Sequence, residues 1–136
     1  MKLSHITARY GELPILENFS LELPDSGVIC FFAPSGTGKT TLLNLLCGLL
    51  QPDSGSITGL EGKRFAFVFQ EDRLIPSLSA RDNVGLVLDW EHQELAARYL
   101  SDLNLSGWEN ALPQELSGGM QRRVAIARAF AYGEQC

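Results

Sequence analysis

The sequence is poor in cysteine and has no long hydrophobic run, and each absence excludes a class of protein. Widely spaced cysteines in odd number form neither a disulfide framework nor a zinc site; there are three, Cys30, Cys47 and Cys136. Cys30 and Cys47 lie in apolar segments, so we expect both to be small buried side chains in a reducing, cytosolic compartment. The longest apolar stretch, residues 41–50, is far short of the ~20 residues that a membrane-spanning helix needs, and the polar residues after Lys2 exclude a secretory signal.

Positive charge is also scarce. The 136 residues include 11 Lys and Arg against 16 Asp and Glu, which gives a net charge of −5. Binding of nucleic acid through an extended basic surface is therefore not expected. Hydrophobic residues make up 45% of the chain and charged residues 20%, which excludes a disordered chain. The length fits one folded domain with a core, or a fragment of a larger domain.

Hydrophobic patterning predicts an α/β fold. Short strands are predicted over residues 2–10, 15–23, 28–32, 56–58 and 64–69. The segment 28–32 is apolar throughout, which is typical of a strand buried in a parallel sheet. A helix is predicted over residues 39–50, and because it is apolar on most faces we expect it to be buried.

The second half of the chain is predicted to be helical. Residues 77–113 have a helical pattern with four inward positions, Leu86, Leu95, Tyr99 and Leu103. A last helix is predicted over residues 117–132, with Ser117 as its N-cap and Gly133 at its end. Its apolar side recurs at helical spacing through Met120, Val124, Ala127 and Ala131.

The first chemical motif is Ala33-Pro-Ser-Gly-Thr-Gly-Lys-Thr40, which matches the phosphate-binding P-loop pattern at every fixed position but the first. Gly36 and Gly38 let backbone N–H groups turn inward toward phosphate oxygens. Lys39 is expected to reach the β- and γ-phosphates, and Thr40 to place its hydroxyl on Mg²⁺. The expected phosphate-binding set is Ser35, Gly36, Thr37, Gly38, Lys39, Thr40 and Thr41.

Ala33 stands where the pattern has glycine. If the position needs a backbone angle that only glycine adopts, alanine strains the loop; if the angle is ordinary, alanine costs little. The sequence leaves both readings open. A plain glycine turn would share part of this pattern, but an apolar segment before it and an apolar helix after it are the context that a phosphate loop requires.

The second motif is Leu116-Ser-Gly-Gly-Met-Gln-Arg-Arg123. A serine and two glycines at a helix N-terminus expose N–H groups and a hydroxyl to an anion, although a flexible helix cap would have the same residues. Taken with the phosphate loop, this motif resembles the signature of the ATP-binding subunits of ABC transporters. Gln70 after an apolar segment, and the helical stretch before the signature, follow in the same order, so the resemblance covers essentially the whole chain.

The resemblance implies a P-loop NTPase fold, with a RecA-like core, N-terminal antiparallel strands and an inserted helical subdomain, incomplete at the C-terminus. It divides the chain into strands and phosphate-loop core (1–76), helical subdomain (77–116) and signature helix (117–133). It also implies that Tyr10 stacks on adenine, although a strand aromatic in a core or on a surface is an equal alternative. Gln70 is then expected to contact Mg²⁺ and the attacking water.

Further implications concern partners. The signature residues Ser117, Gly118, Gly119 and Gln121 would cap ATP held by a second subunit in a head-to-tail dimer. The resemblance implies ATP and Mg²⁺ as cofactors, and permease subunits and a solute-binding protein as partners, on the cytoplasmic face of the cell membrane. The expected function is to couple ATP binding and hydrolysis to solute import. Residues 69–76 are similar to importers for nitrate, sulfonate or taurine.

The family pattern continues beyond the last residue of this sequence. The Walker B aspartate, the catalytic glutamate and the switch histidine would follow the signature helix, and the sequence ends at Cys136. Glu134 follows no apolar strand, and both histidines, His5 and His92, precede the signature. We therefore expect these 136 residues by themselves to bind nucleotide without efficient hydrolysis, and to expose apolar edges.

Three alternatives remain open at this point. Another P-loop NTPase, such as a small-molecule kinase, would leave residues 116–123 unexplained. A nucleotide-binding or regulatory remnant would bind ATP without turnover and would lose binding when Lys39 is replaced. A non-functional product of an interrupted gene would do neither.

Overall fold

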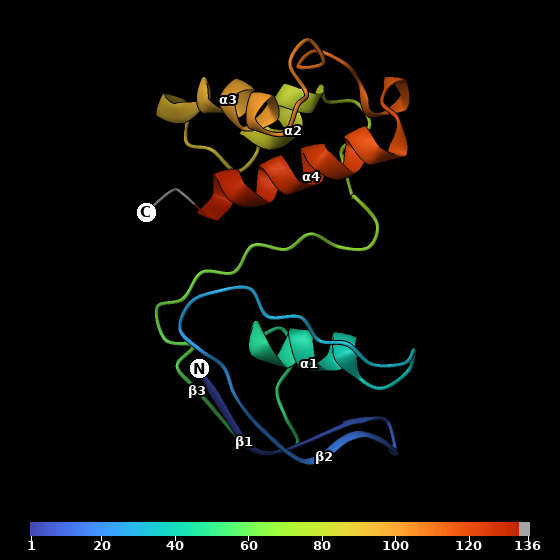
Figure 1. The fold of residues 1–136 in the computed structure, drawn as a ribbon, viewed down its shortest axis with the longest axis vertical. Coiled ribbons are helices and arrows are strands. Elements are labelled where there is room, and N and C mark those ends of the chain that lie inside the picture. The colour runs from blue at the N-terminus through green and yellow to red at the C-terminus, as the bar shows by residue number, and fades with distance from the viewer. Residues whose placement is uncertain (134–136) are drawn as a thin grey trace. The chain divides into compact units, whose positions relative to one another are not determined.

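Figure 1 shows the computed structural model, which describes residues 1–133. Glu134 and Cys136, which bear on the sequence predictions, lie outside the described residues. The chain divides into two compact units, one of residues 1–63 and one that begins at Arg64. No helix among residues 1–133 is both long and apolar enough to cross a membrane.

The first unit contains a three-stranded antiparallel sheet in the order β2-β1-β3. Strand β1 spans Lys2–Tyr10, β2 spans Leu13–Glu22 and β3 spans Ser54–Thr58. The strands predicted over residues 2–10, 15–23 and 56–58 are confirmed, and the last two begin two residues earlier than predicted. In the register, Leu3 of β1 lies opposite Leu21 and Ile57 of its two neighbours.

An irregularity in β1 aligns its apolar side chains. Strand residues normally alternate between faces, so Leu3 and Ile6 would point to opposite sides. His5 adopts a left-handed φ of 52°, and the pairing of β1 shifts between Leu3 and Ile6. This bulge brings Leu3, Ile6 and Ala8 into one buried cluster. The His5 ring nitrogen Nδ1 lies 2.8 Å from Oδ1 of Asn18, which also has a left-handed φ, 49°.

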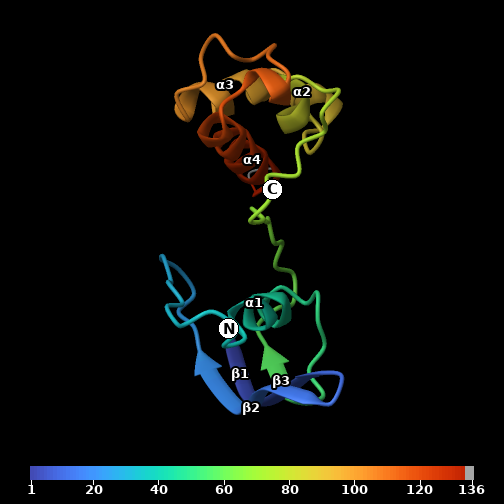
Figure 2. The same cartoon turned by 90° about the vertical axis from the view of Figure 1, so that its right-hand side faces the viewer.

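Helix α1, which spans Lys39–Leu46, packs on this cluster. Figure 2 shows it lying across one face of the sheet. Its buried residues are Leu42, Leu45 and Leu46. The helix predicted over residues 39–50 ends four residues early, and it is not buried on most faces as expected, because Leu43 is 46% exposed.

Two predicted strands are wrong. Residues 28–32 and 64–69 have no regular structure and pair with no strand among the described residues. An isolated strand leaves its N–H and C=O groups without partners, so apolar composition alone cannot hold it extended in a sheet. Val28 and Phe32 are almost fully exposed. The expectation for Cys30 is wrong for the same reason, since it is exposed, and Cys47 is half-buried.

The second unit is helical, as predicted. It contains α2 (Ala80–Gly85), the 3₁₀ turn η1 (Trp90–His92), α3 (Leu95–Asp102), the 3₁₀ turn η2 (Pro113–Glu115) and α4 (Gly118–Gly133). Its core joins residues of α2, α3 and α4 and of the segments between these helices: Ala80, Val84, Leu88, Ala96, Tyr99, Leu100, Leu105, Leu116, Val124, Ala127 and Ala131. Of the four predicted inward positions, Tyr99 is buried and Leu95 and Leu103 pack against this core. Leu86 is wrong: it caps the C-terminus of α2 and is 52% exposed.

Helix α4 matches its prediction closely. Ser117 precedes it, and its hydroxyl accepts a hydrogen bond from the Met120 backbone N–H at 3.3 Å. Val124, Ala127 and Ala131 are buried, because their spacing places them on the side that faces α2 and α3. The N-terminus of α4 therefore carries the Ser-Gly-Gly motif on a helix that the core of this unit holds firmly.

Candidate phosphate-binding site

The loop before α1 has the backbone shape that its glycines predict. Gly36 and Gly38 have left-handed φ angles of 82° and 87°, which other residues adopt only with strain. Gly38 is restricted in space as well, because a Cβ placed there would lie 2.7 Å from Cγ2 of Ile15 on β2. The close approach of this glycine to β2 places the loop against the sheet.

The structure decides between the two readings of Ala33. Among residues 1–133, the non-glycine residues with positive φ are His5, Asn18, Arg73 and Asn104, so Ala33 does not have the angle that would require glycine. Alanine therefore adds no backbone strain at the first position of the pattern.

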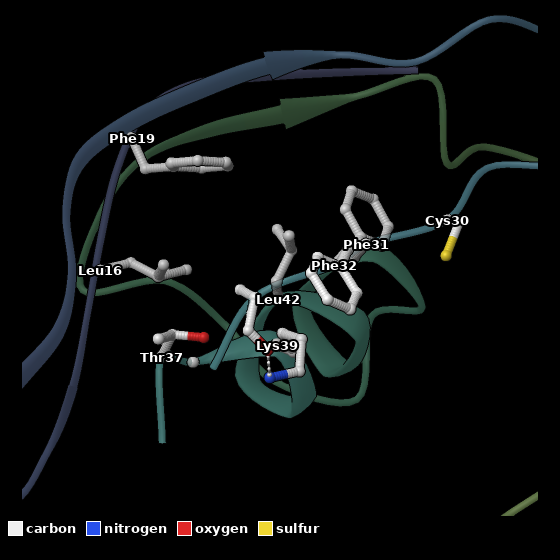
Figure 3. A pocket seen from close by; sticks show the side chains of 10 residues that line it. Leu16, Phe19, Cys30, Phe31, Phe32, Thr37, Lys39 and Leu42 are labelled. Atoms are coloured by element: carbon white, nitrogen blue, oxygen red, sulfur yellow. Dashed lines mark hydrogen bonds between the residues drawn. The ribbon is translucent and has the colours of Figure 1, made fainter. Parts of the chain in front are cut away.

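The Lys39 side chain folds back over the start of its own loop. Its ammonium nitrogen donates hydrogen bonds to the carbonyl oxygens of Ala33, at 2.7 Å, and Pro34, at 2.5 Å. The Thr37 hydroxyl donates to the same Pro34 oxygen at 2.9 Å. Figure 3 shows Lys39 and Thr37 beside each other in the wall of a pocket. Carbonyl groups hold the cation in place without neutralising it, so its charge remains available to an anion.

The N-terminus of α1 has no side-chain cap. Gly38 is its N-cap residue, and no side chain accepts from the N–H groups of its first turn. Helix α2 differs, because Ser79 precedes it and accepts from the Asp82 N–H at 3.1 Å. The open donors of α1 and the positive end of its dipole are together suited to a phosphate group.

A pocket of about 360 Å³ adjoins the loop. One side is polar and is formed by Thr37, Gly38 and Lys39, and the rest is apolar: Leu16, Phe19, Cys30, Phe31, Phe32, Ala33 and Leu42. No lining residue is an aspartate, a glutamate or a histidine. The pocket therefore offers a cation and backbone donors, and none of its lining residues is a carboxylate or imidazole base.

The other predicted site residues fall into two groups. Ser35 to Thr41 and Tyr10 belong to the first unit, where Tyr10 ends β1 and is 84% exposed. Gln70 and the signature residues belong to the second unit. Gln70 is exposed, and its side chain has no hydrogen-bond partner among the described residues.

The signature residues lie at the N-terminus of α4. Ser117, Gly118 and Gly119 are exposed, and both glycines face open space. Gln121 has a different environment, because its amide nitrogen donates to the carbonyl oxygens of Pro113, at 2.7 Å, and Leu116, at 3.1 Å. Its amide group therefore fastens η2 to α4 within this unit.

Sequence reasoning missed two arginines of α4 and one aspartate. Arg122 donates to the Phe69 carbonyl oxygen and to Oδ1 of Asp72, and Arg128 donates to two backbone oxygens of the same segment. The only signal in the sequence was that Arg122 stands inside the signature motif. Its partner lies 50 residues earlier, and no spacing rule links the two.

Comparison with known proteins gives one consistent result. Residues 16–135 match the protein family described as "ABC transporter". The chain is 42% identical, over 85% of its length, to the aliphatic sulfonates import ATP-binding protein SsuB 1 of Pseudomonas savastanoi pv. phaseolicola, of which it covers 49%. It is 38% identical, over 99% of its length, to the taurine import ATP-binding protein TauB of Escherichia coli O157:H7, covering 58% of that protein.

A plant protein and a solved structure are also similar. The chain is 38% identical over 90% of its length to the chloroplastic protein TRIGALACTOSYLDIACYLGLYCEROL 3 of Arabidopsis thaliana, covering 41% of it. The structure of the dimeric ATP-binding cassette MJ0796 bound to ADP and Pi matches 96% of this chain and 69% of its own, with 32% identity and a TM-score of 0.79. The chain thus spans about half the length of the curated relatives that it matches.

Proposed function

The chain belongs to the ABC transporter family, and from this membership we propose that it is part of an ATP-binding subunit that couples ATP binding and hydrolysis to solute import. The observation that carries the proposal is the Ala33–Thr40 loop, with two left-handed glycines, an uncapped helix N-terminus and the Lys39 ammonium beside it. These are the features that bind the phosphates of a nucleotide. Import is favoured because the SsuB and TauB relatives are import ATP-binding proteins.

In this function the first unit binds the nucleotide. Residues Ser35 to Thr41 hold the phosphates through backbone N–H groups and hydroxyls, and Lys39 neutralises their charge. Lys39 exchanges its two carbonyl partners for phosphate oxygens, which are stronger acceptors because they are charged. Tyr10, exposed at the end of β1, supplies a face on which adenine stacks.

Mg²⁺ fits this site if the nucleotide supplies most of its ligands. The described residues hold no group of three or more Asp, Glu, His or Cys side chains that could bind a metal ion. Thr40, on the first turn of α1, offers an exposed hydroxyl. For Gln70, a residue of the second unit whose side chain has no hydrogen-bond partner among residues 1–133, the family resemblance implies the role of a further oxygen ligand. Mg²⁺ prefers oxygen ligands and commonly takes them from substrate phosphates, so it would balance phosphate charge here.

The second unit serves the partner subunits. Ser117, Gly118 and Gly119 are free to cap ATP bound by another copy in a head-to-tail dimer, and the dimeric cassette MJ0796 supports such a pairing. Gln121 supports the motif through the η2 carbonyls, and it reaches that ATP only if its amide leaves them. Permease subunits and a solute-binding protein complete the transport system, with the chain peripheral on the cytoplasmic face of the membrane.

The test is titration of the purified chain with ATP and with Mg²⁺-ATP. We expect Lys39→Ala to weaken binding at least about 100-fold, because a charged hydrogen-bond donor to phosphate is lost. Lys63→Ala is the matched control, since Lys63 is an exposed lysine of the same unit outside the loop. Equal affinity of the Lys39→Ala and Lys63→Ala variants would contradict the proposal.

A further inference from the structure

Two arginines of α4 hold the segment Phe69–Arg73, which contains Gln70. The guanidinium of Arg122 donates to the backbone oxygen of Phe69 and, at 3.1 Å, to Oδ1 of Asp72. The Asp72 and Arg122 side chains are 20% and 41% exposed, so the ion pair is partly shielded from water. It is therefore stronger than a fully exposed surface pair.

The second arginine holds the end of the same segment. Arg128 donates through one nitrogen, Nη2, to the backbone oxygens of Asp72 and Arg73, both at 3.1 Å. Arg73 has a left-handed φ of 47°, and its guanidinium lies 4.0 Å from the centre of the Phe69 ring. The segment thus folds back on itself, and the two arginines fasten it at both ends.

Gln70 lies between Phe69 and Asp72, which the arginines bond, but neither arginine bonds Gln70 itself. Its side chain is exposed and has no hydrogen-bond partner among residues 1–133. Arg122 and Arg128 bond the backbone oxygens of the segment and the Asp72 carboxylate, so they leave the Gln70 amide free to bond another group. A fixed backbone with a free polar side chain is the arrangement of a group that is positioned for a ligand.

We propose that Arg122 and Arg128 are positioning residues that fix the backbone of the Gln70 segment to α4 and so set the direction in which the Gln70 amide points. The proposal rests on the proposed function, because it assigns Gln70 to Mg²⁺-nucleotide. Residues that orient a metal ligand usually change metal affinity about 10-fold to 100-fold when they are removed. The arginines therefore act through Gln70, without touching the nucleotide.

Backbone dynamics measured by ¹⁵N NMR relaxation test the anchoring without any nucleotide. Because Arg122 and Arg128 bond the backbone oxygens and the Asp72 carboxylate of this segment, we expect the order parameters of residues 70–73 to fall from about 0.85, typical of rigid backbone, to below about 0.6 in Arg122→Ala and in Arg128→Ala. Arg123→Ala is the matched control, since Arg123 on the same helix donates to the oxygens of Leu103 and Asn104 instead. Equal order parameters at residues 70–73 in Arg122→Ala and Arg123→Ala would overturn the proposal. If Arg122→Ala does not fold, Asp72→Asn removes the ion pair alone and is expected to lower these order parameters by a smaller amount.

Nucleotide titration tests positioning against mere stabilisation. We expect Arg122→Ala and Gln70→Ala each to lower the affinity for Mg²⁺-ATP about tenfold, and to leave the affinity for Mg²⁺-free ATP unchanged. Arg122→Lys should restore part of the loss. A purely structural role would lower both affinities together or neither, and either result would overturn the proposal. If Lys39→Ala leaves ATP binding intact, the proposed function itself fails, and the order parameters of residues 70–73 still show whether Arg122 and Arg128 hold the segment.

Discussion

Gly38 at the start of α1 and Ile15 on β2 approach so closely that a Cβ on Gly38 would lie 2.7 Å from Cγ2 of Ile15. The phosphate loop is therefore held against the sheet at the residue that precedes Lys39. Because Gly38 also has a left-handed φ of 87°, two independent requirements favour glycine over every other residue there.

Gly38→Ala should destabilise the first unit and weaken ATP binding. The left-handed backbone costs about 1–2 kcal/mol for alanine, and the contact with Ile15 adds to this cost. Chemical unfolding followed by circular dichroism measures the loss. Gly48→Ala is the control, because Gly48 has a φ of 71° with nothing within 4 Å of its Cβ position. If the two variants lose equal stability, the contact with Ile15 has no energetic role.

Ala33→Gly should not improve the loop. Ala33 does not have a positive φ, so glycine relieves no strain. Glycine instead increases the entropy of the unfolded chain, which lowers the free energy of unfolding by about 0.4–1 kcal/mol. We expect ATP affinity to stay within about twofold, by titration. A large gain in affinity would show that alanine impairs this site.

Asn83→Ala should unfold the second unit more readily. Asn83 is fully buried, and its amide bonds the backbone of Ile75, Leu78 and Ser79 at 2.8–3.1 Å. Removing these bonds leaves buried polar groups unpaired, at a cost of about 2–4 kcal/mol. Denaturant titration followed by tryptophan fluorescence reports this unit, because both tryptophans lie in it.

Asn110→Ala is the matched control for that experiment. Asn110 is exposed and has no hydrogen-bond partner among the described residues. Its removal should change the free energy of unfolding by less than about 0.5 kcal/mol. A similar loss in both variants would mean that the Asn83 bonds are not what holds the 75–79 loop.

The purified chain of residues 1–136 should bind ATP and hydrolyse it slowly. No residue that lines the phosphate-loop pocket is an aspartate, a glutamate or a histidine. A positioned general base contributes about 10²–10⁴-fold to a rate, so we expect turnover at least about 100-fold below that of a cassette with such a base. Phosphate release measures it. Fast turnover that disappears in Lys39→Ala would refute this prediction.

Cys47 should react with alkylating reagents more slowly than Cys30. Burial raises the pKa of the Cys47 thiol, so less of it is thiolate near neutral pH, whereas Cys30 is exposed. Because folding raises the pKa of the Cys47 thiol, the contribution of this thiol to the free energy of unfolding is present below its pKa in the unfolded chain. That contribution is lost as the pH rises through its pKa in the folded chain. Peptide mapping by mass spectrometry follows each thiol separately. Equal rates at the two cysteines would contradict the assigned burial.

Local patterns in the sequence were sufficient for the features that depend on neighbours along the chain. The Gly36 and Gly38 angles, the start of α1 at Lys39 and the extent of α4 follow from residues within a few positions of each other. Glycine spacing, helix capping and helical periodicity are local, so one sequence reveals them. The family assignment, which the comparisons confirm, rested on two such local motifs.

Only the tertiary structure decided the features that depend on distant partners. The segment 28–32 has the composition of a strand, yet a strand exists only where another strand pairs with it, and composition does not show that partner. The left-handed turn at His5, which aligns Leu3 with Ile6, carries no signal in a histidine. Arg122 and Asp72 meet across 50 residues because the chain returns along α4. The sequence by itself thus determined the phosphate-binding loop and the signature motif. Packing determined which distant side chains contact each other, since such contacts are properties of the whole fold.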